Sequence, residues 1–249
     1  MITAGVDLSA SPASTAVAVV EWREHGVDRR GLSAVLRELV TPADDSTIRR
    51  LVDGADRCGI DSPFGWPDAF VDFVAAHHRG GTSAGSGLDE IAARRPLAYR
   101  STDRYLVEHG LGRPLSVSAD QIAHVAFRCA GLLADLGVSN RVDGWAVEAY
   151  PAGALKHWGL TSRGYKRSTH RDVLAGLVDD LRAAAPWLDV GRHSALMAGN
   201  DNAFDAVVTA LIARAASLGG TALPFEADVP IAHREGWIHV PTGRLDDLR

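Results

Sequence analysis

The sequence is poor in cysteine, with only Cys58 and Cys129 in the chain. These two lie far apart and form no CxxC pair, so no zinc signature is present. Two isolated cysteines are typical of a protein whose thiols stay reduced, and we therefore expect a cytoplasmic protein with buried, unpaired thiols.

Long apolar runs are also absent. No stretch approaches the roughly 18 consecutive apolar residues that a membrane span requires. The first residues, MITAGVDLSA, lack a basic region followed by a long apolar region. This start is unlike a signal peptide and is typical of a first strand, so we expect no membrane partner.

The chain has no excess of positive charge, because 26 lysines and arginines face 31 acids and give a net charge of −5. Proteins that coat long duplex DNA are usually basic overall. The balance therefore argues against indiscriminate duplex binding and leaves local basic patches as the route to nucleic acid. Any such substrate is expected to be short, structured or single-stranded.

What the chain does have is enough apolar sequence for one large core, since 46% of its 249 residues are hydrophobic. Alternating patterns predict strands at residues 2–7, 14–22 and 32–40, joined by short turns as an antiparallel meander. Later strands alternate with helices, which favours a mixed sheet. We predict a single α/β domain over residues 1–249, with a helical insertion at roughly 67–140.

Acidic residues stand where the predicted strands and the last long helix would meet. Asp7 and Asp61 end apolar strands, at the edge where α/β sheets place ligands. Asp201 and Asp205 lie four residues apart and share one helix face. Converging carboxylates repel one another unless a divalent cation neutralises them, and Mg²⁺ or Mn²⁺ prefers such oxygen ligands. All four acids are therefore candidate metal ligands.

Several of these acids also have structural interpretations. Asp201, beside Asn200, suits a helix N-cap or first turn, and Asp61 in Asp-Ser-Pro suits an Asx-turn. Glu148, in a strand with alternating faces, either contacts metal or substrate or points to solvent. Asp205 lies one turn inside an almost wholly apolar helix, so we expect it to be paired or functional.

Basic and aromatic residues gather in two stretches that follow predicted strands. Arg100 and Arg104 lie one helical turn apart and suit a phosphate clamp. Cations hold phosphates and aromatic rings stack on bases, although a solvated basic face is the alternative. The other candidate substrate-binding residues are Trp66, Lys156, Tyr165, Lys166 and Arg167. Trp66 is either a stacking platform or part of the core.

Six segments resemble, in this order, the domain-of-unknown-function 429 family, described as predicted RNase H-like nucleases: GVDLSA, TAVAVVEW, GIDSPFGWP, RSTDRYL, VEAYPAGAL and DNAFDAVVTALIARA. The resemblance implies an RNase H-like fold with a mixed five-stranded sheet, in which three antiparallel strands precede two parallel ones, and helices on both faces. It also implies a catalytic site made of Asp7, Asp61 and Asp205, with Asp201 and Glu148 as further acids.

The resulting hypothesis is a metal-dependent nuclease or other phosphodiester hydrolase that uses a metal-activated water. One alternative is an ATP-dependent phosphotransferase of the sugar-kinase and actin type, because GVDLSASPAST also resembles the first phosphate loop of that group. Those proteins need two such halves, which about 250 residues hardly hold. A second alternative is a catalytically silent nucleic-acid-binding module on the same fold.

Overall fold

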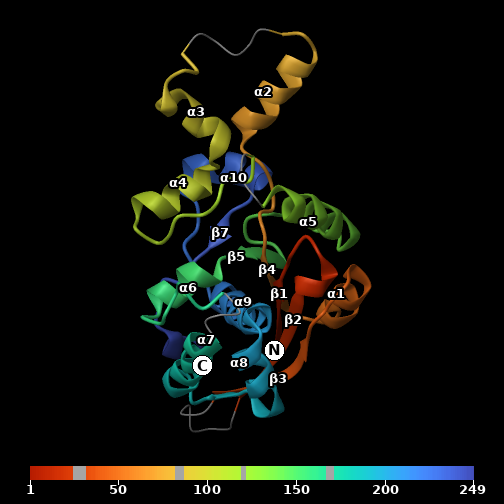
Figure 1. Cartoon of the computed structure of the whole chain (residues 1–249), viewed down its shortest axis with the longest axis vertical. Helices are drawn as coiled ribbons and strands as arrows, with labels where there is room; N and C mark the ends of the chain where they lie inside the picture. Colours follow the sequence, from red (N-terminus) through yellow and green to blue (C-terminus); the bar gives the residue numbers. More distant parts are fainter. Residues whose placement is uncertain (25–31, 82–86, 119–121, 167–170) are drawn as a thin grey trace.

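A seven-stranded mixed sheet forms the centre of the computed structural model, which describes residues 1–24, 32–81, 87–118, 122–166 and 171–249. The strand order is β6-β3-β2-β1-β4-β5-β7 (Figure 1). The strands are β1 (Ile2–Asp7), β2 (Ala16–Glu24), β3 (Leu32–Val40), β4 (Arg57–Asp61), β5 (Ala146–Ala149), β6 (Leu188–Asp189) and β7 (Ile238–His239).

The strand directions confirm the predicted antiparallel meander. β1, β2 and β3 pair antiparallel, whereas β4 is parallel to β1 and β5 is parallel to β4. The expected count of five strands is wrong for the described residues, because β6 and β7 add one short strand at each edge. Each of these has only two residues, which is too short for an alternating pattern to specify a strand.

Helices cover both faces of this sheet (Figure 1). One layer has α9 directly on β1, β2, β4 and β5, with α6, α7 and α8 around it, and the opposite face is covered by α1 and α5. The helices are α1 (Asp45–Val52), α2 (Asp68–His78), α3 (Ile91–Ala98), α4 (Ser101–Glu108), α5 (Ala123–Asp135), α6 (Pro151–His157), α7 (Arg171–Ala184), α8 (Ser194–Gly199), α9 (Asp201–Ser217) and α10 (Val229–Glu235).

Two glycines let α9 lie unusually close to the sheet. Alternate residues of β1 face opposite ways, so Ala4 and Val6 pack in the core beside α1 and α5 while Gly5 faces α9. Gly59 of β4 faces α9 in the same way, against Thr209. The absence of side chains at these two positions leaves room for helix backbone, and α9 is buried from residue 203 to residue 216.

The region between β4 and β5 contains α2, α3, α4 and α5. α2 and α3 have no fully buried residue and extend away from the sheet at the top of Figure 1. α5 returns to the sheet and buries Cys129, Leu132 and Leu133 against it. Among the described residues, we find no helix with the length and apolar character to cross a lipid bilayer.

Candidate metal centre

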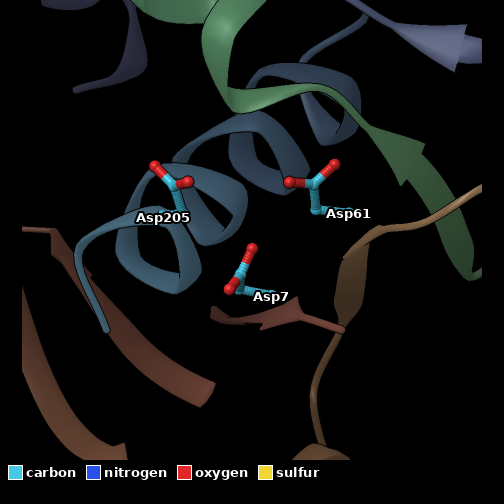
Figure 2. A group of neighbouring side chains, drawn as sticks. All are labelled: Asp7, Asp61 and Asp205. Carbon is cyan, nitrogen blue, oxygen red and sulfur yellow. The ribbon is translucent and has the colours of Figure 1, made fainter. Parts of the chain in front are cut away.

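Three aspartates converge at one edge of the sheet. Asp7 is the last residue of β1, Asp61 is the last residue of β4, and the two are register partners in the parallel pair. Asp205 comes from the second turn of α9. One carboxylate oxygen from each lies within 4.8 Å of the other two, and the three groups point toward one another (Figure 2). A divalent cation can therefore take one oxygen from each residue.

The glycines beneath α9 explain this convergence. Asp7 lies two residues after Gly5, and Asp61 lies two residues after Gly59, so both carboxylates point to the α9 face of the sheet. Gly5 contacts the backbone of Ala206, which follows Asp205 directly. The contact that seats the helix thus also places Asp205 beside the two strand ends.

The charges at this site are poorly compensated. Burial, followed by repulsion from Asp205 and Asp61, raises the pKa of Asp7 well above its usual range. Burial also raises the pKa of Asp61 to about 7, although the charge of Lys166 opposes the shift. The pKa of Asp205 is raised by burial as well. Carboxyl groups with such shifts favour a protonated state or a bound cation.

Asp205 already has two partners within the chain. The buried Tyr165 donates its phenolic hydrogen to Oδ1 at 2.8 Å, and Lys166 Nζ lies 2.5 Å from Oδ2. The Lys166 side chain is 51% exposed, whereas that of Asp205 is 1% exposed. Lys166 therefore reaches the carboxylates from the solvent side and supplies one positive charge to three acids.

Asp201 lies near the three aspartates but is not one of the converging group. Asn200 is the N-cap of α9, and its side-chain oxygen accepts a hydrogen bond from the amide of Ala203 at 3.0 Å. Asp201 follows as a first-turn acid, where the helix dipole favours negative charge. Its charge contributes to the raised pKa of Asp7 and of Asp205.

Glu148 points to the other face of the sheet. It is the register partner of Ile60, whose side chain packs on the α1 and α5 side. Its carboxylate forms a double ion pair with Arg100, at 2.7 and 2.8 Å, and accepts the amide hydrogen of Phe64 at 2.9 Å. Glu148 is 2% exposed, which excludes the interpretation that it points to solvent.

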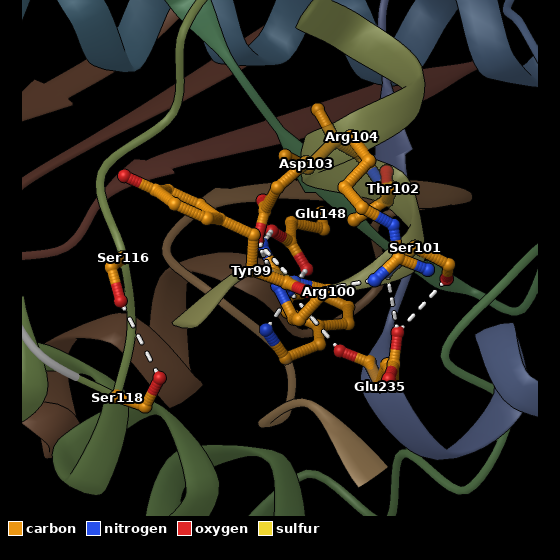
Figure 3. A network of polar contacts seen from close by, with 12 residues as sticks. Tyr99, Arg100, Ser101, Thr102, Asp103, Arg104, Ser116, Ser118, Glu148 and Glu235 are labelled. Carbon is orange, nitrogen blue, oxygen red and sulfur yellow. Dashed lines mark hydrogen bonds and ion pairs between the residues drawn. The ribbon is translucent and has the colours of Figure 1, made fainter. Parts of the chain in front are cut away.

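Arg100 is the centre of a buried polar network (Figure 3). Besides Glu148, its guanidinium contacts both oxygens of Asp103 and the carbonyl oxygen of Glu235. The Glu235 carboxylate in turn accepts hydrogen bonds from the Ser101 hydroxyl and amide. The network ties α4, β5 and the end of α10 together. Sequence reasoning missed Asp103 and Glu235, although the three-residue spacing of Arg100 and Asp103 was a usable signal.

The remaining candidates are scattered. Arg104 is directed to the carbonyl oxygen of Tyr99 at 3.2 Å, so the structure does not join it to Arg100 as a clamp. Lys156 donates to the carbonyl oxygen of Gly110 at 2.6 Å. Arg167 lies outside the described residues.

Trp66, the last of the candidates, lies away from the aspartates. Its ring stacks on Phe127 of α5 with 5.7 Å between ring centroids. It lines a separate hollow that also contains Arg141 and Arg234. The structure therefore does not bring Trp66 together with the metal-site candidates.

A cavity of about 410 Å³ opens at the edge of the sheet where the aspartates meet. Asp7, Asp61 and Lys166 line it together with Tyr150. The two cysteines contribute nothing to this site, because both are buried without a disulfide and burial raises the pKa of each thiol to about 12.

Comparison with known proteins gives one match. No curated protein and no solved structure matches the chain. The family described as a protein of unknown function (DUF429) matches residues 5–229, which run from β1 to the first residue of α10 and include all three converging aspartates. Because this match covers most of the sequence, the chain belongs to the DUF429 family.

Proposed function

We propose that the protein is a metal-dependent phosphodiester hydrolase, a nuclease with an RNase H-like fold. The observation that carries the proposal is the convergence of Asp7, Asp61 and Asp205 at the carboxyl ends of two parallel strands, against a buried helix. Ligands in α/β sheets bind at this edge. Groups with strongly raised pKa values cluster at functional sites, and three converging carboxylates of this kind suit cation binding or proton exchange.

The topology supports the RNase H-like part of the proposal. The order β3-β2-β1-β4-β5 contains three antiparallel strands followed by two parallel ones, with helices on both faces. The aspartates come from the first strand, the fourth strand and the last long helix, as the resemblance implies. β6 and β7 are additions at the edges of this five-stranded core.

The donor set suits Mg²⁺ or Mn²⁺, because all three residues offer carboxylate oxygens and none offers sulfur or nitrogen. Asp7, Asp61 and Asp205 would hold the ion, which would supply charge neutralisation and an activated water for attack on phosphorus. Tyr165 fixes the orientation of Asp205 through its hydrogen bond. Lys166, exposed at the mouth of the site, is placed to bind a phosphate oxygen of the substrate.

The alternatives receive less support. A phosphotransferase of the sugar-kinase and actin type needs a second half around its nucleotide, and the described part of the chain has a single sheet. A silent binding module would keep the cavity without using the aspartates as ligands. Binding of Mn²⁺, measured by calorimetry, separates a silent module from a hydrolase.

The decisive experiment compares the wild type with Asp205→Asn on labelled single-stranded RNA, single-stranded DNA and branched DNA, each with Mg²⁺ or Mn²⁺. We expect cleavage by the wild type and a loss of about 100-fold or more in the variant, because a metal ligand is removed. Asp179→Asn is the matched control, since Asp179 is an exposed acid on α7. Equal behaviour of the wild type and Asp205→Asn on every substrate would overturn the proposal.

A further inference from the structure

The cavity beside the three aspartates has an apolar wall. Leu8, which follows Asp7, and three residues from the region between β4 and β5, namely Leu115, Ile122 and Val125, line the same hollow as the carboxylates. Leu115 is 51% exposed, so its side chain stands at the surface. A site that binds only a phosphate backbone has no need of an apolar wall. A site that binds a nucleobase does, because the face of the base packs against it.

An aromatic ring completes this wall. Tyr150 follows β5 and lines the cavity. A Cβ atom at Gly112 would lie 2.5 Å from Cε1 of Tyr150, so the ring packs directly on the segment that precedes Leu115. Glycine at position 112 therefore allows this ring to be held in place, and the cavity offers a fixed aromatic surface.

Positive charge is sparse among the described residues that line the cavity. The cations among them are Lys166 and Arg100. Arg100 is 1% exposed and its guanidinium is occupied by Asp103, Glu148 and Glu235. Among the described lining residues, Lys166 is therefore the one cation whose side chain is half exposed, and its ammonium group is paired with Asp205. A duplex crossing the site needs a row of phosphate contacts, and one cation suits a single phosphate.

The volume of the cavity also favours a small ligand over a duplex. Its volume of about 410 Å³ falls in the range of sites that enclose one small ligand. Segments that follow β1, β4, β5 and α4 surround it at the edge of the sheet.

We propose that this pocket receives one unpaired nucleotide, with its base against Leu115 and Tyr150 and its phosphate beside Lys166, Asp7 and Asp61. The inference rests on the proposed function and narrows its substrate to single-stranded ends and short single strands. In the reaction, a water oxygen bonds to phosphorus and the bond to the leaving nucleoside oxygen breaks. That oxygen takes up a proton, so one water is consumed and a phosphate monoester and an alcohol are formed.

The first test measures binding of a nucleoside 5′-monophosphate in the presence of Mg²⁺ by calorimetry. We expect binding by the wild type and at least tenfold weaker binding by Leu115→Trp, which fills the mouth of the pocket. Leu223→Trp is the matched control, because Leu223 is also 51% exposed and lies outside the lining of the pocket. No binding by the wild type, or equal binding by the wild type and Leu115→Trp, would overturn the inference.

The second test compares cleavage of a labelled single strand with that of a blunt duplex of the same sequence. We expect the single strand to be cut at least tenfold faster, with mononucleotides released stepwise from an end. Equally fast cuts inside the duplex would refute the pocket assignment and leave the hydrolase proposal standing. Nucleotide binding without cleavage of any substrate would refute the hydrolase proposal and leave the pocket assignment standing.

Discussion

A Cβ atom on Gly5 would lie 2.1 Å from the carbonyl oxygen of Ala206, so β1 and α9 touch backbone to backbone at this point. The approach is closer than any side chain allows. Because Ala206 is adjacent to Asp205, the spacing between strand and helix also sets the distance between Asp205 and Asp7. The geometry of the candidate metal centre thus depends on a residue that has no side chain.

Replacement of Gly5 by alanine should therefore damage both stability and metal binding. The added methyl group meets helix backbone that cannot rotate away, and such overpacking costs about 1–3 kcal/mol of the free energy of unfolding. We expect a lower midpoint in urea unfolding and weaker Mn²⁺ binding by calorimetry. Gly176→Ala on α7 is the control, because a Cβ there meets nothing within 4 Å. Unchanged Mn²⁺ affinity in Gly5→Ala would contradict this account of the site.

The pKa of Asp61 predicts how stability depends on pH when metal is removed. Its folded-state pKa of about 7 lies above the unfolded value of 3.8. Between these two pH values, the Asp61 carboxyl group keeps its proton in the folded protein and has lost it in the unfolded chain. Stability in a chelator should then fall as pH rises from about 4 to about 7. The measurement is the difference in melting temperature between the wild type and Asp61→Asn, which lacks this titration.

Addition of metal should reverse the fall in stability of the wild type with rising pH. An ion that binds the ionised aspartates stabilises only the folded state, by about 2.7 kcal/mol at a hundredfold excess over its dissociation constant. We expect Mn²⁺ to raise the melting temperature of the wild type most near pH 7, and to have little effect on Asp61→Asn. An equal increase for both proteins would show that the ion binds elsewhere.

Lys166→Met should separate metal binding from substrate binding. Lys166 Nζ lies 2.5 Å from Asp205 and its positive charge opposes that of an incoming cation. Two unit charges about 4 Å apart repel each other by about 1 kcal/mol even in bulk water, so removal of this charge should make Mn²⁺ binding at least roughly fivefold tighter. Hydrolysis should nevertheless slow, because a phosphate contact is lost. Arg163→Met is the control, because Arg163 is an exposed arginine nearby in sequence. Weaker Mn²⁺ binding by Lys166→Met would contradict the prediction.

Arg100→Met tests whether this arginine is structural. It would leave Glu148 and Asp103 buried without their partner, and breaking a buried ion pair from one side costs about 3–5 kcal/mol. We expect a large drop in the midpoint of urea unfolding. Arg182→Met, which removes an exposed pair with Asp179, should change stability by no more than about 1 kcal/mol. A stable Arg100→Met protein with weakened substrate affinity would instead support the phosphate clamp expected from the sequence.

The sequence was informative where one local pattern decides the outcome. Alternation along β1 and β4 placed Asp7 and Asp61 at strand ends, and the apolar character of α9 marked Asp205 as exceptional. The role of Arg100 could not be read in this way. Its burial depends on Glu148 and Glu235, which are distant in sequence and meet it only after the chain has folded.

The edge strands escaped prediction for a different reason. β6 has two residues and pairs with β3, which is distant in sequence. Its two residues carry no pattern of their own. The apolar wall of the pocket could not be predicted either, since Leu115 lines the same cavity as Asp7 and Asp61 through the path of the backbone after α4 and not through any periodicity.

The contact between Gly5 and Ala206 also has a consequence for biosynthesis. Ribosomes deliver β1 early and α9 late, and the intervening elements separate them along the chain. Until α9 emerges, the face of the nascent sheet that it covers has no partner helix, and Asp7 and Asp61 stand without Asp205. Long-range contacts of this kind form slowly. The candidate metal centre is therefore among the last parts of the protein to be completed, and the proposed hydrolysis requires that α9 has docked.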